Sequence, residues 1–281
     1  MAGKLILVAT PIGNMNDLSH RAAETLEQAD FIAAEDTRVS IKILNHLGLK
    51  KPMVSYYEHN RRERGEEIVA RIEAGETCAL VTDAGMPAIS DPGEDLVALC
   101  VERGITVSVV PGACAAVSAL AVSGLPTGRF TFEGFLSVNK RSRSEHLALI
   151  AHEKRTMIFY EAPHKLRSTL ADMLVCLGDR RITLVRELTK IYEENIYTTL
   201  SEAIRLYEDK APRGEYVLVI EGEQEESKTQ STDDLEDALA LISTYEKEGI
   251  STSEAIKRVA KETGIKKSQL YNSTMLRKNE G

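Results

Sequence analysis

Short runs of β-branched and aliphatic residues alternate with amphipathic helical patterns along most of this chain. In the first half the apolar runs predict strands at 5–9, 31–34, 53–56, 78–82 and 106–110. The helical patterns cover about 18–28, 39–47, 61–73, 94–103 and 113–122. Strands that alternate with helices in this way are typical of parallel sheets whose strands are joined by crossover helices. The sequence therefore predicts the α/β fold class.

Gly and Pro residues at 123–128 predict a break between two α/β domains. We expect an N-terminal domain at 1–126 and a second domain at 127–222. The second domain should contain strands near 130–135, 156–160, 182–186, 197–199 and 216–221. The segment 223–234 is polar and acidic, which predicts a linker, and residues 235–281 should form a small helical domain.

The sequence of this C-terminal segment predicts helices that are separated by a glycine turn. This arrangement resembles a helix-turn-helix. Ser251 and Glu254 form a capping box at the start of its second helix, and Gly264 follows that helix. Between 249 and 281 there are seven Lys or Arg and three Glu, a local charge of +4. A basic segment favours a nucleic-acid partner. A solvated helical hairpin that packs on the body or on a second subunit explains the pattern equally well.

The whole chain has 281 residues and a formal net charge of −8, so any contact with nucleic acid must come from local basic patches. Its four cysteines are far apart and show no C-x-x-C spacing, which favours reduced core thiols in a cytoplasmic protein and no metal site. The longest weakly polar run, 113–125, is too short to cross a bilayer, and the first residues read as a strand. We therefore expect no membrane association.

Three Gly- and Pro-containing segments follow predicted strands of the first domain, at 9–14, 82–93 and 111–114. Parallel sheets place ligand sites at the carboxyl ends of their strands, where these segments would lie. The middle segment has two Gly, two Pro and two Asp, and a rigid loop of this kind can hold a polar ligand through its main chain. A purely structural loop remains an alternative. The chain has no G-x-G-x-x-G, Walker, G-x-S-x-G or H-E-x-x-H motif.

Charged and aromatic side chains also gather after the second and third predicted strands, at 35–38 and 56–64. Arginine can bind a phosphate in a bidentate manner, and tyrosine can stack on a base, so a phosphate-bearing polar substrate would suit this pattern. Helix capping by Asp36 and Asn60 is the alternative explanation. A further basic group at 140–143 is expected in a loop of the second domain.

The chain resembles the tetrapyrrole methylase (class III) family of S-adenosylmethionine-dependent methyltransferases over about residues 4–222. Eight motifs, in order, carry this resemblance. They are VATPIGN at 8–14, AAEDTR at 33–38, YYEHN at 56–60, TDAGMPAISDPG at 82–93, VVPGACAAVSALAVSGLP at 109–126, FYEAPHKL at 159–166, VRELTKIYEE at 185–194 and RGEYVLVIEG at 213–222. Tetrapyrrole methylases have a glycine-rich first loop, whereas this chain has TPIGN, and their G-D-P core here reads Gly85-Met86-Pro87.

The resemblance implies two α/β domains with S-adenosylmethionine in the cleft between them, and a homodimer. Within the family, the motifs are most similar to those of enzymes that methylate the ribose 2′-oxygen of a decoding-centre cytidine in 16S rRNA of the small ribosomal subunit. The implied cofactor contacts, several of them through the backbone, fall on Pro11, Asp83, Gly85, Ala88, Cys114, Ala115, Glu161 and Leu188.

Such a reaction requires the ribose oxygen to be aligned with the sulfonium methyl group and its proton to be removed. The candidate substrate-binding residues are Glu35, Arg38, Tyr57, Asn60 and Glu187. Asp36 and His59 are the candidate proton acceptors. A small-molecule tetrapyrrole methylase is the alternative enzyme, and a non-catalytic nucleic-acid-binding sensor is the alternative of another class.

Overall fold

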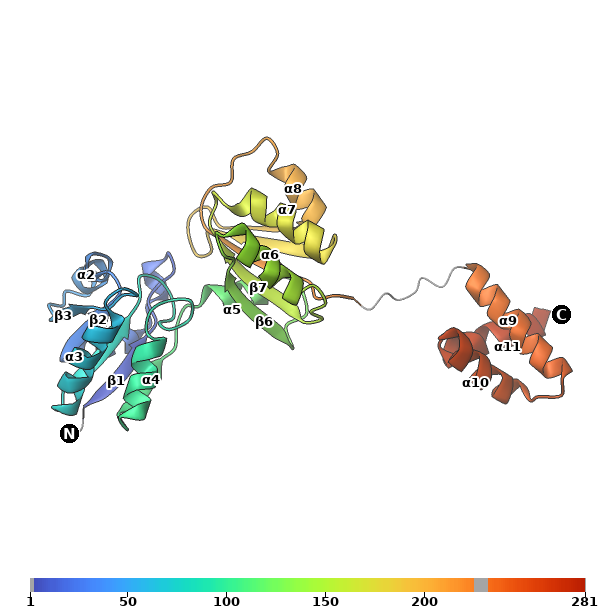
Figure 1. The fold of residues 1–281 in the computed structure, drawn as a ribbon, viewed down its shortest axis with the longest axis horizontal. Helices are drawn as coiled ribbons and strands as arrows, with labels where there is room; N and C mark the ends of the chain where they lie inside the picture. The colour runs from blue at the N-terminus through green and yellow to red at the C-terminus, as the bar shows by residue number, and fades with distance from the viewer. Residues whose placement is uncertain (1–2, 225–231, 281) are drawn as a thin grey trace. The chain divides into compact units, whose positions relative to one another are not determined.

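The computed structural model describes residues 3–224 and 232–280. The chain divides into two compact units, Met1–Glu223 and Gln224–Gly281. The predicted linker at 223–234 lies largely outside the described residues. The first unit contains two five-stranded sheets, and the second is helical (Figure 1).

The first sheet is parallel throughout and has the strand order β3-β2-β4-β1-β5. Its strands are β1 (Lys4–Val8), β2 (Phe31–Ala34), β3 (Met53–Ser55), β4 (Thr77–Val81) and β5 (Thr106–Val110). The helices of this part are η1 (Met15–Asp17), α1 (His20–Gln28), α2 (Thr37–His46), α3 (Arg61–Glu73) and α4 (Glu94–Glu102). The prediction of an α/β fold with a parallel first sheet is confirmed.

Alternate residues of β1 belong to different cores, because side chains of a strand point to opposite faces of the sheet. Leu5 and Leu7 pack with buried residues of α3 and α4. Ile6 and Val8 pack with buried residues of α1 and α2. The sheet is therefore covered on both faces, which explains why its strands read as continuous apolar runs.

The second sheet is mixed and has the order β6-β7-β10-β8-β9. Its strands are β6 (Phe130–Phe135), β7 (Thr156–Glu161), β8 (Arg181–Arg186), β9 (Glu194–Thr199) and β10 (Tyr216–Ile220). Only β6 and β7 pair in parallel, whereas β10 is antiparallel to β7 and β8, and β8 is antiparallel to β9. The expected parallel pairing is thus wrong for most of this sheet, because β10 runs antiparallel between β7 and β8, and β8 and β9 form an antiparallel hairpin.

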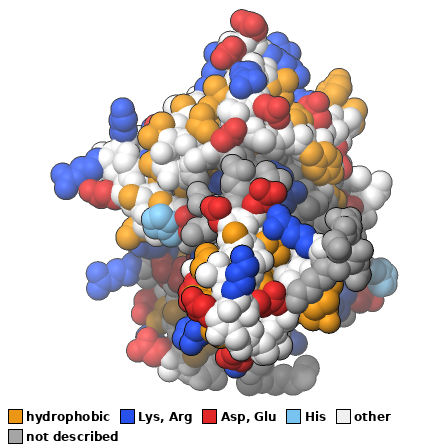
Figure 2. All heavy atoms as spheres, turned by 90° about the vertical axis from the view of Figure 1, so that its right-hand side faces the viewer, with side chains coloured by type: hydrophobic (Ala, Val, Ile, Leu, Met, Phe, Trp, Pro, Cys, Tyr) orange, Lys and Arg blue, Asp and Glu red, His pale blue; other side chains and the backbone are white. Residues whose placement is uncertain are grey.

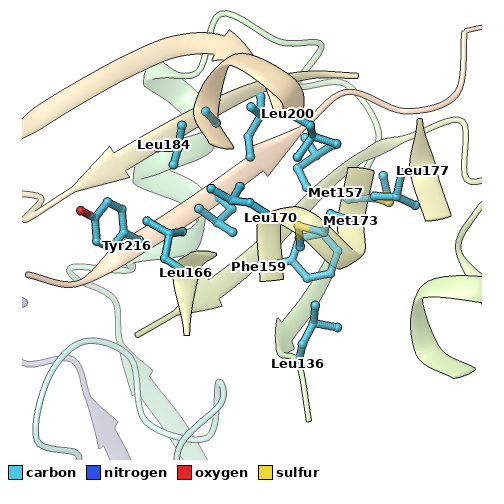
Figure 3. Packing of buried hydrophobic residues seen from close by; sticks show 14 of the residues in the cluster. Leu136, Met157, Phe159, Leu166, Leu170, Met173, Leu177, Leu184, Leu200 and Tyr216 are labelled. Atoms are coloured by element: carbon cyan, nitrogen blue, oxygen red, sulfur yellow. The ribbon is translucent and has the colours of Figure 1, made fainter. Parts of the chain in front are cut away.

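One face of the second sheet is covered by α6 (Lys140–Leu149), α7 (Leu166–Leu177) and α8 (Leu200–Leu206). Figure 3 shows Leu166, Leu170 and Met173 of α7 in the cluster that they form with strand residues such as Phe159. The other face is covered by α5 (Ala115–Val122), whose Ala116, Ala119 and Leu120 pack on β7, β8 and β10. Although α5 precedes the predicted boundary at 126, it packs on the second sheet; the domain boundaries remain predictions.

The basic group at 140–143 lies in the first turn of α6 and not in a loop, because the side chain of Asn139 caps that helix. Asp36 likewise caps α2 through Arg38 N. Asn60 does not cap α3 with its side chain, which instead accepts from Tyr57 N and donates to Ser55 O. The predicted capping role of Asn60 is therefore wrong.

The second unit contains α9 (Thr232–Lys247), α10 (Thr252–Thr263) and α11 (Lys267–Glu280). Its core is formed by residues such as Leu239, Ile256 and Leu270. Ser251 caps α10 through Glu254 N, and Gly264 at its end adopts φ +75°, as the sequence predicts. On the face drawn in Figure 2, basic and acidic side chains are interspersed. No helix of the described residues is long and apolar enough to cross a membrane.

Candidate active site

The loops that follow β1 and β4 are tied together at the carboxyl end of the first sheet. Thr10 N donates to Gly85 O at 2.9 Å, and Gly85 N donates to Thr10 O at 3.1 Å. The Thr10 hydroxyl donates to the carbonyl of Thr82 at 3.1 Å. These bonds fix the TPIGN segment against the 82–93 loop, as expected for neighbouring strands of a parallel sheet.

A cavity of about 400 Å³ lies beside these loops and is bounded by residues from both sheets of the first unit. The first sheet contributes loop residues and the second contributes residues from the ends of its strands. The residues of the cavity wall used below are Ile12, Gly85, Ser90, Asp91, Cys114, Ala115, Tyr160, Glu161, Glu187, Leu188 and Tyr216. A volume of this size accommodates a small-molecule ligand or cofactor.

Small residues keep the first-sheet side of the cavity open. Gly85 has φ +93°, and a Cβ atom there would lie 3.2 Å from Ile12 Cγ2. Cys114 at the start of α5 makes no side-chain cap, while Ala116 N donates to the Tyr160 hydroxyl at 3.1 Å. The backbone of this helix start is therefore accessible to a ligand only because the adjacent side chains are small.

The second sheet contributes a buried carboxylate, Glu161, which is only 2% exposed. It accepts from Ala162 N at 2.8 Å and from the Thr169 hydroxyl at 2.5 Å, and Lys165 Nζ lies 3.9 Å away. These partners hold the carboxylate in a fixed position in the cavity wall. It can accept hydrogen bonds from ligand hydroxyl or ammonium groups.

An acidic cluster, defined here as Glu35, Asp83 and Asp91, lies around Thr82 at the end of β4. The Thr82 hydroxyl donates to Glu35 Oε2 at 2.7 Å, and Asp83 Oδ1 accepts from Asp36 N at 3.1 Å. Burial, reinforced by the charge of Glu35, raises the pKa of Asp91 to about 6, while a hydrogen bond with Thr82 lowers it in part. Burial and the Glu35 charge also raise the pKa of Asp83.

Asp91 occupies a distinctive position within this cluster. It lines the cavity and also a neighbouring hollow of about 290 Å³, which Tyr56, Glu58 and Arg61 line as well. The residue before it, Ser90, has φ +61°, a left-handed conformation that is uncommon for a serine. The strained loop therefore presents a carboxylate of raised proton affinity between the cavity and the segment that contains the YYEHN motif.

The candidate proton acceptors from the sequence lie elsewhere. Asp36 accepts a bidentate pair of hydrogen bonds from Arg38, which together with Arg38 N lowers the pKa of Asp36 to about 2. A carboxylate with this pKa is a weak base. His59 is exposed and makes an edge contact with Tyr57 at a ring-centroid distance of 6.3 Å. Neither Asp36 nor His59 lines the cavity.

Glu187, the candidate substrate residue of the second sheet, does line the cavity. Its Oε1 accepts from Lys190 Nζ and from Glu215 N, each at 2.9 Å. Burial opposes the charged form, but these hydrogen bonds outweigh it and lower the pKa of Glu187. The carboxylate is thus charged and already held by protein donors, which suits it for a structural or binding contact.

The structure brings together only part of the set predicted from the sequence. Of the cofactor candidates, Gly85, Cys114, Ala115, Glu161 and Leu188 line the cavity, whereas Pro11, Asp83 and Ala88 do not. Ala88 lines the neighbouring hollow instead. The substrate candidates Glu35, Arg38, Tyr57 and Asn60 also lie outside the cavity wall. The assignment of roles to these residues remains a prediction.

Sequence reasoning did not single out Asp91 or Tyr160. Asp91 was visible only as the second Asp of the 82–93 loop, and its burial beside Glu35 depends on contacts between strands that are distant in sequence. Tyr160 appeared as an ordinary strand residue, although burial raises the pKa of its hydroxyl to about 12 and the hydroxyl holds the start of α5.

Comparisons with known proteins agree with this architecture. The family described as Tetrapyrrole (Corrin/Porphyrin) Methylases matches residues 4–204. The chain is 46% identical over 275 residues to Ribosomal RNA small subunit methyltransferase I of Synechocystis sp., covering 97% of this chain and 98% of that protein. It is 41% identical to the protein of the same name from Bacillus subtilis, covering 96% and 94%. The Thermotoga maritima protein of that name is 46% identical, covering 79% of this chain and 100% of its own length.

Two solved structures illustrate the fold. One is uroporphyrin-III C-methyltransferase from Thermus thermophilus, complexed with S-adenosylhomocysteine, which is 20% identical with a TM-score of 0.54 and covers 79% of this chain and 98% of that one. The other is a diphthine synthase, which is 12% identical with a TM-score of 0.59 and covers 78% and 90%. At these identities the similarity concerns the fold alone.

Proposed function

Because the chain belongs to the tetrapyrrole methylase family, whose methyl donor is S-adenosylmethionine, we propose that it methylates ribosomal RNA of the small subunit. The observation that carries this proposal is the similarity along nearly the whole chain to relatives named for that activity, at 46% and 41% identity. The second observation is chemical: the cavity offers backbone groups, four carboxylate side chains and two tyrosines around a space of cofactor size.

The residues of the cavity fit the donor. Gly85, Cys114 and Ala115 would hold it through main-chain contacts, since their small side chains leave the backbone open. Glu161 would accept from its hydroxyl or ammonium groups, and Leu188 would supply an apolar surface. When bound, the donor supplies a methyl group on a positively charged sulfur, which is already activated for transfer. The protein must therefore chiefly position the acceptor oxygen and accept its proton.

In this proposal the acceptor is the 2′-hydroxyl of a cytidine ribose in the decoding centre of 16S rRNA. Asp91 takes the hydroxyl proton at one of its carboxylate oxygens. A general base works best when its pKa lies near the operating pH, and Asp91 is closer to that condition than Asp36. Tyr57 and Asn60 follow β3 near the hollow on the far side of Asp91, where a nucleotide could be received.

A small-molecule tetrapyrrole substrate is the less favoured alternative. The solved tetrapyrrole methylase cited above shares only 20% of its residues with this chain, whereas the relatives named for ribosomal RNA share more than twice that fraction. A non-catalytic sensor would bind the donor without turnover.

We further propose that the chain acts as a homodimer and that α10 and α11, with basic residues such as Lys257 and Lys267, help to contact the RNA.

The test is transfer of labelled methyl groups from S-adenosylmethionine to small ribosomal subunits purified from cells that lack this protein. We expect labelled 2′-O-methylcytidine in the 16S rRNA, identified by mass spectrometry of its nucleosides. Naked 16S rRNA and a tetrapyrrole precursor serve as parallel substrates. Incorporation into the tetrapyrrole alone would support the alternative enzyme, and donor binding without incorporation into any substrate would support the sensor.

A further inference from the structure

A basic hollow of about 300 Å³ lies at the end of β8 and the beginning of β10. Three of its five lining residues are cations: Arg186, Lys210 and Arg213. Arg186 is the last residue of β8 and pairs in register with Tyr216, the first residue of β10. The hollow is thus built at the junction of two neighbouring strands in the centre of the second sheet.

Two of the three cations are available to a ligand. Arg186 is held by Glu194, whose carboxylate oxygen lies 3.1 Å from Arg186 Nε. Within the described parts of the chain, the side chains of Lys210 and Arg213 have no hydrogen bond or ion pair, and both residues are exposed. Carboxylates thus offset the charge of Arg186, through its ion pair with Glu194 and its proximity to Glu187, whereas Lys210 and Arg213 have no ion pair among the described residues. This excess of positive charge contrasts with the net charge of −8 of the whole chain.

The basic hollow shares a wall with the cavity. Tyr216 lines both spaces. Its hydroxyl accepts from Arg213 N at 3.4 Å and lies 3.2 Å from the hydroxyl of Tyr207. Since Tyr207 and Tyr216 are almost completely buried, this wall is rigid, and an anion bound in the hollow would lie at a fixed position beside the methyl-transfer site.

We propose that the basic hollow binds a backbone phosphate of the RNA strand that carries the methylated nucleotide. This inference rests on the proposed function. An arginine can bind a phosphate through two parallel hydrogen bonds, and a lysine adds a compact charge, so the group suits a phosphodiester. Contacts to phosphates position a nucleic acid without reading its sequence. The hollow would thereby hold the strand while the residues of the cavity act on one ribose.

The test compares the full-length protein with the double variant Lys210→Ala/Arg213→Ala in binding to small ribosomal subunits from cells that lack this protein. We expect affinity to fall about tenfold or more, since the lost contacts are hydrogen bonds to charged groups. The slope of log affinity against log salt concentration should decrease by about one for each cation removed. Affinity for S-adenosylmethionine, measured by calorimetry, should not change.

Two further variants separate charge from structure. Lys4→Ala/Lys50→Ala removes the same amount of charge from Lys4, the first residue of β1, and from Lys50, which precedes β3. Both residues lie at or before the amino ends of strands of the first sheet, so this variant should leave the salt slope unchanged. The charge-preserving variant Lys210→Arg/Arg213→Lys should retain the wild-type slope.

Unchanged subunit affinity and slope in Lys210→Ala/Arg213→Ala would overturn the proposal, as would an equal loss in Lys4→Ala/Lys50→Ala. A parallel loss of S-adenosylmethionine affinity would also overturn it, because the hollow would then serve the donor. Failure of the wild-type protein to bind or methylate the subunits would instead overturn the proposed function itself.

Discussion

Two groups of opposite charge lie beside the cavity of the first unit, one on each sheet. The first sheet carries the acidic cluster, Glu35, Asp83 and Asp91, at the carboxyl end of β4. The second carries the basic hollow, with Arg186, Lys210 and Arg213 at the ends of β8 and β10. The comparison suggests a division of roles, because a carboxylate of raised pKa can accept a proton. Cations such as Lys210 and Arg213, which have no ion pair among the described residues, can instead bind phosphate.

The largest effect is expected at Asp91. Asp91→Asn should lower the rate of methyl transfer by roughly 10²–10⁴-fold, the usual range for the loss of general acid–base catalysis. The measurement is single-turnover transfer to small ribosomal subunits at saturating donor. Asp36→Asn provides the comparison, because it removes an acceptor predicted from the sequence whose pKa is already about 2. If Asp36→Asn proves the more damaging change, Asp91 is not the proton acceptor.

A smaller effect is expected at the start of α5. Ala115→Leu would crowd the approach of the donor to the main chain, and overpacking of this kind costs roughly 1–3 kcal/mol. The affinity for S-adenosylmethionine should then fall about tenfold to a hundredfold by calorimetry. Ala121→Leu, at an exposed position of the same helix, should bind normally. Equal affinities for the two variants would remove Ala115 from the donor site.

The raised pKa of Asp91 also predicts a dependence on pH. The groups that act on the pKa of this carboxyl are Glu35, Thr82 and Asp83. The adjoining hollow adds the titratable and charged side chains of Tyr56, Glu58, Arg61, Glu94 and Asp95. Since the unprotonated form is the active base, transfer should rise as pH increases through about 6 and then level off. A profile that is flat between pH 5 and 8, under conditions where transfer itself is rate-limiting, would argue against this role.

The raised pKa of Asp91 also makes the free energy of unfolding depend on pH. A carboxyl with a raised pKa in the folded state stabilises the fold below its unfolded pKa of about 4, and this contribution is lost as pH rises through about 6. In urea titrations, the wild type should therefore lose stability relative to Asp91→Asn between pH 4 and 7. A difference that does not vary with pH would show that Asp91 has an ordinary pKa.

The smallest effect on donor binding should come from removing the second unit. The Thermotoga maritima relative is covered over its full length by 79% of this chain, so about a fifth of the chain has no counterpart in it. A chain that ends at Glu223 should bind S-adenosylmethionine with an affinity within about twofold of the full-length protein, because every residue of the cavity precedes that position. A large loss of donor affinity would mean that the helical unit completes the site.

Much of the fold follows from local sequence patterns. The continuous apolar runs around Leu5 and Phe31 predict buried parallel strands, and Ser251 and Gly264 mark the ends of α10. The mixed pairing of the second sheet could not be predicted in this way. Its strands are buried in similar ways whether their neighbours run parallel or antiparallel, so the insertion of β10 antiparallel between β7 and β8 leaves no trace in the apolar pattern.

The candidate site shows a similar limit. Gly85 and Ala115 lie in motifs whose small residues already suggest a backbone contact, and both line the cavity. Asp36 and Asp91 cannot be ranked from the sequence, because each is simply an Asp that follows a strand. Their difference arises from the neighbours: Arg38 holds Asp36 charged, whereas burial beside Glu35 favours a proton on Asp91.

The most direct test of the proposed division of roles is the rate of methyl transfer as a function of small-subunit concentration for the wild type, Asp91→Asn and Lys210→Ala/Arg213→Ala. Loss of Asp91 should lower the maximal rate without changing the subunit concentration that gives half of it. Loss of the two cations should raise that concentration and leave the maximal rate nearly intact. If both variants instead lower the maximal rate to the same degree and leave the half-saturating subunit concentration unchanged, the proposed roles are contradicted: Asp91 and the two cations would then not act separately in proton transfer and in RNA binding.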